Sequence, residues 1–547
     1  MRLNIKKISL LFTGCILFSS AQATQITIVN QDAPGVGLND STAVTPVTGN
    51  PGTTKGEQAL NVFKAAANYW EKRLHSPVEI KVNMNFAQLY CTATTAVLGS
   101  AGATSYAMNF ANTPEADTWF PMALKRSLIG TGGSYSAGNN ADINAQFNGG
   151  IGQANCLAGK SWSYAIDDLA PPANQAKLYQ TAIHEIGHGL GFATLVNSTT
   201  GQKGGYTSGG TFYGFDDQYM KYLKDTTSSL PWTAMTDAQR AASAKNTGNL
   251  IWTGAKAVAE ATPLLTAGKN GNNPSMYAPD PVESGSSVSH WSKTLSPDEL
   301  MEPALTPISK AQLTTQAFYD MHWVDPCRIT KTLVAGQWTQ ISLPCVAPSN
   351  ANTVATIIGD DMTGTYGTDW VVYSYDPATN AYVDLGTGGV MESGKGYWVI
   401  SVGSSATLDM PHNSIGANSS VATECTSTND CFDIALATKA GANQWQMIGN
   451  PYRDNIKVAD IRLHKNTGSS TCNDADGCTF NDANQNTLAN NELWSYNGTS
   501  YQNLLLGTDI EPWTGAWLAT LSGADGSAPE LYLPKKEAIP SYEEPNY

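Results

Sequence analysis

The stretch HEIGHGLGF, residues 184–192, constrains the fold of this chain more than any other feature. His184 and His188 are four residues apart, so on a helix both imidazoles leave one face about a turn apart, while Glu185 points slightly aside. In the His-Glu-x-x-His pattern two histidines bind zinc and the glutamate acts as a general base. The apolar spacing of residues 174–190 is helical, which places this pattern on a helix.

Three glycines lie in the same stretch, at Gly187, Gly189 and Gly191. Inside a helix each costs about 1 kcal/mol relative to alanine, so a helix built only for stability would avoid them. A helix that is crowded against a site and then stopped by a left-handed glycine would accept them. We therefore expect Gly191 to form the turn that ends the helix.

A catalytic zinc normally takes three protein ligands and a water, so a third ligand is needed. Position 194, three residues after Gly191, would be a natural place for it, but the residue there is Thr194. A different arrangement continues the helix to a later glutamate, here Glu260, but the stop at Gly191 and the lack of supporting carboxylates disfavour it. The remaining histidines are His75, His290, His322, His412 and His464.

These five histidines have different settings in the sequence. His412 and His464 lie in a strand-rich C-terminal region, and His75 ends a predicted first helix. His322 stands beside Trp323 in a predicted last helix and is expected to pack there. His290 lies in the segment SVSHWSKTLSPDELMEP, residues 287–303.

That segment carries a more specific pattern. His290 is followed by Trp291 and then by the run Asp-Glu-Leu-Met-Glu-Pro at 298–303. Together with Gly191-Phe192, this resembles the leishmanolysin-type metzincins, and in particular their bacterial secreted branch, in which an insertion separates the two-histidine motif from the third histidine. The resemblance implies that His290 is the third zinc ligand, that Met301 forms the Met-turn beneath the metal, and that 192–289 is the insertion.

The resemblance covers residues 24–326, which would form a metzincin-like zincin catalytic domain of an α+β protein. Residues 235–254 and 276–291 are also similar to exported bacterial relatives, some of which carry an extra domain between these segments. The chain departs from the protozoan enzymes in leaving little room for a propeptide before its first helix. Pro303 stands where some metzincins have an assisting tyrosine. Within the insertion, Asp216 and Asp217 are expected to be solvated or to cap a helix.

The motif and the resemblance predict a secreted zinc endopeptidase that uses a zinc-activated water and Glu185 as general base. Its protein or peptide substrate is expected to lie extended beside an edge strand, for which 141–148 is the candidate. Two alternatives stay open: an adhesin or matrix- or glycan-binding protein with a residual zinc site, and a zinc hydrolase acting on cell-wall or glycoprotein substrates. Glu185 favours an enzyme, since a merely structural zinc has no use for a base.

The 547-residue chain is too long for one core, and its net charge of −15 argues against nucleic acid or an anionic membrane as a partner. Residues 1–23 have the pattern of a secretory signal peptide, with a basic start, an apolar run and cleavage after Ala23. Lipoprotein processing at Cys15 is the alternative. No later apolar run is long enough to span a bilayer. We expect a secreted, extracellular protein, with a periplasmic or surface-associated location as alternatives.

Eight cysteines follow the predicted cleavage site, an even number that suggests disulfides in an exported chain. The acidic stretch CNDADGC, residues 472–478, has features of a calcium loop. Its first ligand position is Cys472, however, so a disulfide-closed turn is favoured over calcium. The layout favours local pairing as Cys91–Cys156, Cys327–Cys345, Cys425–Cys431 and Cys472–Cys478.

The periodicity predicts a domain boundary near 326. Helices are predicted over 56–74, 174–190, 235–246 and 308–323, and strands over 78–86 and 140–148. After Cys327 short alternating strands dominate.

An internal repeat then follows, in which residues 336–344, 372–385 and 391–401 parallel 443–451, 493–505 and 510–520. We predict two all-β, sandwich-like modules, 327–420 and 421–547, with extracellular matrix, glycoprotein or polymer as candidate ligands. Recurring positions in strands usually pack, so four tryptophans are expected in the module cores: Trp338, Trp398, Trp445 and Trp517.

Overall fold

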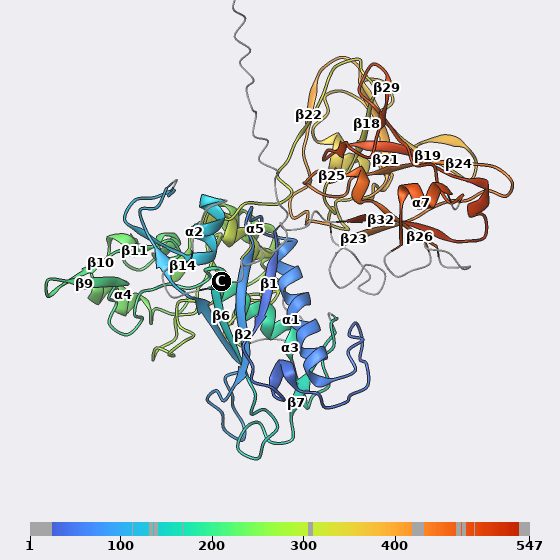
Figure 1. The fold of residues 1–547 in the computed structure, drawn as a ribbon. Coiled ribbons are helices and arrows are strands. Elements are labelled where there is room, and N and C mark those ends of the chain that lie inside the picture. Colours follow the sequence, from blue (N-terminus) through green and yellow to red (C-terminus); the bar gives the residue numbers. More distant parts are fainter. Residues whose placement is uncertain are drawn as a thin grey trace, which may run out of the picture.

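A computed structural model describes residues 24–534 apart from 112, 131–134, 136–139, 168, 305–309, 418–430, 466–471, 473–476 and 486. Within these residues the fold mixes helices with many small sheets, in agreement with the expected α+β class. One hydrophobic core extends from Ile26 to Trp323. The two largest of the others lie in the C-terminal region, which is yellow to red in Figure 1.

The N-terminal region is organised around a four-stranded sheet of order β1-β2-β6-β3. Strands β1 (Ile26–Asn30), β2 (Ile80–Ala87) and β6 (Ile143–Asn148) run parallel, and β3 (Gly99–Ala103) runs antiparallel to β6. The predicted strand over 140–148 is therefore interior. Its assignment as the edge strand is wrong, because β3 covers its outer side and is itself the edge.

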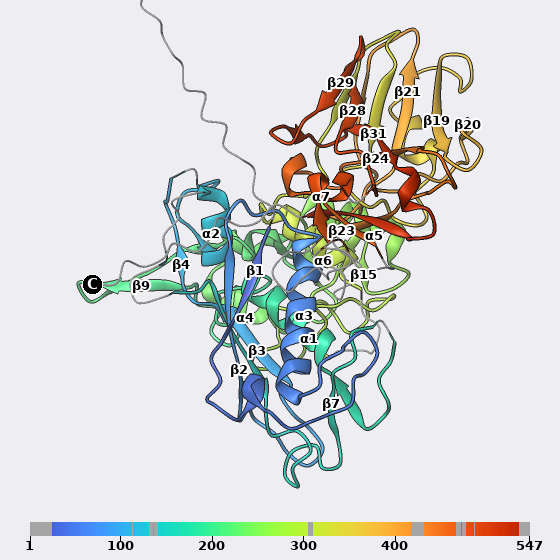
Figure 2. The same cartoon turned by 45° about the vertical axis from the view of Figure 1, so that its right-hand side comes forward.

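Two helices, α1 (Lys55–Glu71) and α3 (Leu178–Leu190), lie side by side next to this sheet in Figures 1 and 2. The helix predicted over 174–190 begins four residues later than expected. Its first residues instead form strand β8 (Gln175–Lys177), which pairs with β7 (Ser161–Ser163).

Two tryptophans fix the position of α3. The indole N–H of Trp70 on α1 donates to the carbonyl of Ile183 at 2.8 Å, and that of Trp323 donates to the carbonyl of Leu190 at 3.1 Å. Both indoles are buried, so these hydrogen bonds hold α3 from two directions in a low-dielectric core.

Four further α-helices lie in the described residues of the N-terminal region. Two of them, α4 and α6, were predicted and are shorter than expected, and the other two, α2 and α5, were not predicted. Helix α6 ends at Asp320, so the prediction that His322 lies inside it is wrong; His322 has a φ of 73°. The helices are α2 (Met122–Ile129), α4 (Asp237–Ser243), α5 (Ala255–Leu264) and α6 (Gln312–Asp320). The remaining strands of this region are β4 (Tyr106–Ala107), β5 (Thr118–Pro121), β9 (Gly205–Ser208), β10 (Thr211–Gly214), β11 (Asp216–Asp217), β12 (Leu223–Asp225), β13 (Leu230–Pro231), β14 (Leu250–Trp252), β15 (Lys269–Asn270) and β16 (Asn273–Pro274).

In the described residues the C-terminal region contains three four-stranded sheets, two of which are built in the same order, β18-β21-β19-β20 and β24-β31-β28-β29. The repeated sequence segments supply the equivalent strands of the two sheets, which lie close together in Figure 2. The first sheet contains β18 (Thr339–Ser342), β19 (Trp370–Asp376), β20 (Ala381–Asp384) and β21 (Gly396–Ser401). The second contains β24 (Gln444–Gly449), β28 (Leu493–Tyr496), β29 (Tyr501–Leu504) and β31 (Gly515–Thr520).

The four recurring tryptophans do not share one environment. Trp398 and Trp517 are buried together where the two sheets meet. Trp338 and Trp445 are 39% and 40% exposed, so their expected burial is wrong. Trp338 immediately precedes β18 and Trp445 lies on β24, and both strands are at the edge of their sheet.

Shorter elements complete the C-terminal region. Trp513, which precedes β31, packs into the core formed mainly by residues 327–410 and donates to the carbonyl of Ile329 at 3.3 Å. The additional elements are β17 (Lys331–Leu333), β22 (Ala406–Leu408), β23 (Cys431–Ala435), β25 (Ile456–Lys457), β26 (Arg462–Lys465), β27 (Cys478–Thr479), β30 (Asp509–Ile510), β32 (Pro529–Pro534) and α7 (Phe480–Gln485).

Three of the expected disulfides are present, Cys91–Cys156, Cys327–Cys345 and Cys472–Cys478. Cys431 is also disulfide-bonded, and Cys425, its predicted partner, lies outside the described residues. Residues 473–476, which include the acidic residues considered as calcium ligands, also lie outside the described residues. Disulfides are consistent with an extracellular protein. In the described part of the chain, no helix has the length and apolar character needed to cross a membrane.

Candidate metal centre

Three histidines meet at one point in the buried part of the N-terminal region. His184 and His188 come from α3, and His290 comes from a loop 106 residues after His184. Their Nε2 atoms are 3.1 to 3.2 Å from one another. A tetrahedral ion with bonds of about 2.0–2.1 Å would separate its ligand nitrogens by about 3.3–3.4 Å. The three side chains therefore form a group that could bind a metal ion.

The other ring nitrogen of each histidine decides what the group can bind. The Nδ1 atoms lie 2.7 Å from the carbonyl of Leu300, 2.8 Å from that of Phe192 and 2.8 Å from that of Ser286. Carbonyl oxygens only accept hydrogen bonds, so each Nδ1 carries the proton and each neutral ring has its lone pair on Nε2. Three converging lone pairs repel one another unless a cation lies between them, so the donor set fits a metal ion.

The electrostatics of the site favour neutral imidazoles. Burial, with a contribution from His188, lowers the pKa of His184 to about 3, and burial lowers the pKa of His188 to about 4. Burial and the two neighbouring rings also lower the pKa of His290. At neutral pH all three rings are available as ligands, because metal binding requires the deprotonated nitrogen.

The glycines of the motif are explained by close packing around α3. A Cβ added at Gly187 would lie 2.9 Å from the sulfur of Met301, and one added at Gly189 would overlap the side chain of Ile143 on β6. Gly191 has φ of 121° and ends the helix, as predicted. The helix therefore approaches the sheet and Met301 more closely than any residue with a side chain would allow.

After Gly191 the chain turns away from the histidines. The hydroxyl of Thr194 donates to the carboxylate of Asp217 at 2.7 Å, and the backbone N–H of Thr194 donates to Ser289 at 3.2 Å. Asp217 is buried and also accepts from the N–H of Met220, the first residue of the short helix 220–222. Of the two roles expected for it, burial excludes solvation, and the bond to Met220 agrees with capping. Asp216 pairs with Lys203. The two ends of the segment 192–289 thus meet beside His290.

The turn that contains Met301 supports the site from the other side. Its Leu300 carbonyl orients His184, and the carbonyl of Met301 accepts from the N–H of Trp291 at 2.9 Å. Glu299 was not predicted as a positioning residue. It is buried and accepts from the N–H of Leu313 and the hydroxyl of Thr314, each at 2.8 Å, which ties this turn to α6. Burial raises the pKa of Glu299 to about 8.

Glu185 lies beneath the edge strand β3. Burial raises the pKa of its carboxyl to about 8, against the opposing effect of a hydrogen bond from the backbone of Ala101. A Cβ added at Gly99 would lie 2.8 Å from Glu185 Cγ. The small residues of β3 therefore leave room for this carboxylate, a role that the sequence did not reveal because Gly-Ser-Ala-Gly-Ala shows no apolar alternation.

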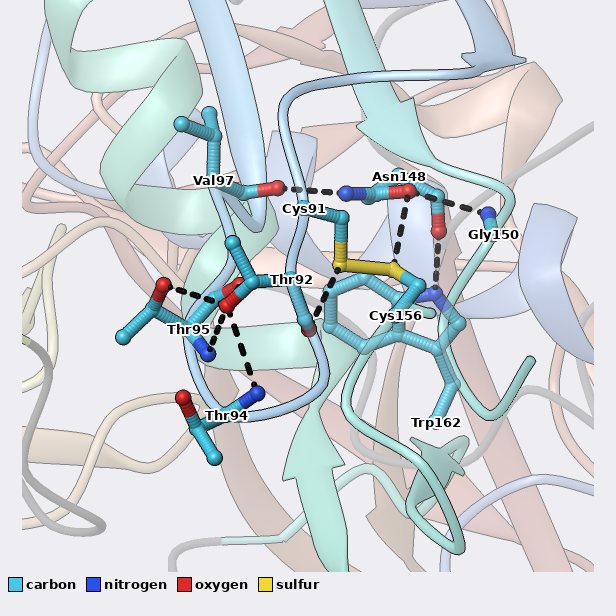
Figure 3. The surroundings of a disulfide bond; sticks show 9 residues. All are labelled: Cys91, Thr92, Thr94, Thr95, Val97, Asn148, Gly150, Cys156 and Trp162. Carbon is cyan, nitrogen blue, oxygen red and sulfur yellow. Dashed lines mark hydrogen bonds between the residues drawn. A yellow bond between two sulfur atoms is a disulfide. The ribbon is translucent and has the colours of Figure 1, made fainter. Parts of the chain in front are cut away.

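A disulfide anchors the loop that leads into β3 (Figure 3). Cys91 in this loop is bonded to Cys156. The side chain of Asn148, at the end of β6, donates to the carbonyl of Val97 at 2.9 Å and accepts from the N–H of Gly150. These contacts fix the start of β3 relative to β6, and hence the position of β3 over Glu185.

The other candidate ligands lie elsewhere. His322 contacts Glu115 at 3.2 Å, and His464 stacks on Tyr532. His412 lies 2.7 Å from Glu260, so the glutamate of the alternative zinc arrangement pairs with a histidine of the C-terminal region instead. His75 forms a β-bridge with Val324.

Comparison of the chain with protein families, curated proteins and solved structures finds no match. Three neutral imidazoles that converge on one point, with a buried carboxylate on the same helix, are suited to metal-assisted hydrolysis.

Proposed function

We propose that the chain is a secreted zinc-dependent endopeptidase with a metzincin-like catalytic region, similar to leishmanolysin. The observation that carries the proposal is the convergence of three Nε2 lone pairs, each fixed by an Nδ1–H donated to a carbonyl. An all-nitrogen set of three ligands is typical of catalytic zinc sites that keep a fourth position open. Met301 under α3 and the turn at Gly191 also agree with this proposal.

In this proposal His184, His188 and His290 hold the ion. A zinc ion held in this way acidifies water and polarises a carbonyl. Glu185 accepts the proton of the attacking water and later delivers it to the leaving amine.

The substrate is proposed to lie extended along the free edge of β3. In the described residues this strand pairs with β6 alone, so the backbone groups of its other side are available for pairing with a peptide, apart from the Ala101 group that donates to Glu185. The path brings a scissile bond next to Glu185, since β3 contacts that side chain through Gly99 and Ala101.

Replacement of the base tests this function. Glu185→Gln should keep zinc and fold but lose at least about two orders of magnitude in peptidase activity, the usual contribution of a general base. Glu260→Gln is the matched control, since Glu260 is also buried but pairs with His412. Zinc content and cleavage of a proteome-derived peptide library are measured with and without chelator.

The same experiment can overturn the proposal. Peptidase activity that survives in Glu185→Gln would contradict the mechanism. A wild-type protein that cuts no peptide, yet binds a surface or polymer as well as the variant does, would favour the adhesin instead. A wild-type protein that hydrolyses cell-wall or glycoprotein amides but no ordinary peptide would favour the third hypothesis.

A further inference from the structure

The two C-terminal sheets that share one strand order, β18-β21-β19-β20 and β24-β31-β28-β29, are two copies of one arrangement. Trp338, Trp398 and Tyr382 of the first sheet occupy the positions of Trp445, Trp517 and Tyr501 in the second. Each buried tryptophan contacts tyrosines of the opposite sheet. Trp398 lies 5.2 Å from Tyr496 and 6.4 Å from Tyr501, while Trp517 lies 4.8 Å from Tyr375 and 6.3 Å from Tyr382. The aromatic surface therefore exists only when both modules are packed together.

Four rings at the rim of this surface stay accessible to solvent. Trp338 and Trp445 are 39% and 40% exposed, and Tyr382 and Tyr501 are 54% and 49% exposed. Equivalent positions are thus exposed to nearly the same degree in both copies.

Trp338 and Tyr501 lie 6.3 and 6.4 Å from Trp398, and Tyr382 lies 6.3 Å from Trp517. Trp445 holds the position in the second copy that Trp338 holds in the first. Exposed aromatic rings grouped around a central pair are more typical of a binding surface than of a packing surface. We call these four residues, with the central Trp398 and Trp517, the aromatic band.

The charge of the band restricts its ligand. The eight strands of the two sheets contain no lysine, arginine or histidine, and Asp376 and Asp384 are their only charged residues. An anionic polymer would meet no cation there and would be repelled by the net charge of the chain. A neutral ligand is favoured.

The two sheets are joined by polar contacts. Gln444 is buried and donates from Nε2 to the side chain of Asn380 at 2.9 Å, across the boundary between the two sheets. At the equivalent place in the other copy, Gln337 lies against the turn at Gly498. A sugar ring has C–H groups on its faces and hydroxyls around its edge. Exposed aromatic faces match the first, and the hydroxyls of the two exposed tyrosines of the band match the second.

We propose that the aromatic band binds a neutral polysaccharide, with one extended chain in contact with both halves of the band. This is a binding activity separate from the histidine site. It does not depend on whether that site is catalytic, because none of the band residues belongs to the metal centre.

Affinity gel electrophoresis of the full chain tests the proposal. The probes are hydroxyethylcellulose, barley β-glucan and galactomannan as neutral polysaccharides, and heparin as the anionic control. The wild-type protein should be retarded by at least one neutral probe and not by heparin. Trp338→Ala and Trp445→Ala should each weaken the apparent affinity by at least about tenfold, because each removes one half of a two-part contact. The double variant should not be retarded.

Tyr90→Ala serves as the matched control, because Tyr90 is an exposed ring of the N-terminal region, in the loop before Cys91. It should migrate like the wild type. Tyr501→Ala probes the same band through a more exposed ring, in case a tryptophan variant folds poorly. Retardation by no neutral probe, or retardation that the double variant retains, would overturn the proposal. The proposal would also be overturned if the wild type were a dimer in sedimentation experiments and the double variant were a monomer, because the band would then bind a second copy of the chain.

Discussion

The histidine site and the aromatic band depart from ordinary burial in opposite directions. In the N-terminal region, three imidazoles and the carboxylate of Glu185 are buried, although ionisable groups normally face water. In the C-terminal region, Trp338 and Trp445 are partly exposed, although large apolar rings normally pack inside. Each departure costs stability, and each lies where we propose that a ligand binds. Places where a fold breaks its own packing rules are therefore informative about function.

The two regions should respond differently to substitution. The buried site is held by surrounding hydrogen bonds, such as those of Leu300 and Phe192, so its function depends on exact positions. The band depends on exposed area, so single substitutions there should affect binding more than folding.

Loss of one imidazole should remove the metal. His290→Ala leaves two protein ligands, and we expect bound zinc to fall below about a tenth of an equivalent at neutral pH. His322→Ala is the matched control, because His322 pairs with Glu115 outside the site. Metal analysis after dialysis measures the result. Full zinc content in the His290 variant would remove this residue from the ligand set. Adding Thr194→His to it should not restore binding, since Thr194 is turned towards Asp217.

A single methyl group on β3 should disturb catalysis without removing the metal. Gly99→Ala places a Cβ 2.8 Å from Glu185 Cγ, so the carboxylate must shift, and kcat should fall by at least about tenfold. Gly102→Ala on the same strand meets no atom within 4 Å and should retain most activity. Zinc content should be normal in both. Equal kcat values for the two variants would contradict the proposed position of β3 over the base.

The smallest effect is expected at a contact between the two regions. The hydrogen bond from His412 to Glu260 raises the pKa of His412, and burial opposes it. A raised folded-state pKa means that this contact stabilises the protein at acidic pH, and that the stabilisation is lost as the pH rises above about 6.5 through the folded-state pKa. His412→Asn should therefore lower the unfolding temperature at pH 5.5 and change it little at pH 8. The side chain of His412 is 60% exposed, so the effect should be under about 1 kcal/mol.

Thermal unfolding of wild type and His412→Asn at the two pH values measures this effect. In a Glu260→Gln background the pH dependence should disappear. A shift of equal size at both pH values would show that His412 contributes through packing and not through its charge.

The sequence predicted the local part of the site and missed much of its surroundings. The spacing of His184 and His188 is a property of one helix, and the glycines of α3 signalled crowding that the structure explains through Met301 and Ile143. His290 lies 106 residues from His184. Helical spacing cannot indicate such a partner, and only the resemblance singled it out.

Features that depend on tertiary contacts were not predictable. Strand β3 consists of glycine, alanine and serine, so its sequence lacks the alternation that marks a strand. In the sequence Asp217 and Glu299 look like ordinary acidic residues. The backbone N–H groups that donate to their carboxylates belong to other segments, so only the folded structure shows their role. The repeat showed that Trp338 and Trp445 are equivalent, but strand order alone decided that both lie at sheet edges.

The most direct test of the account is the metal coordination of the purified full chain. Metal analysis combined with X-ray absorption spectroscopy should find one zinc ion per chain, with three imidazole nitrogens at about 2.0–2.1 Å and one further light ligand. The bound zinc with its three nitrogen ligands should be absent from His290→Ala and present in Glu185→Gln. A protein that binds no zinc when saturated with it, or that binds it through sulfur or carboxylate ligands away from these histidines, would contradict the account.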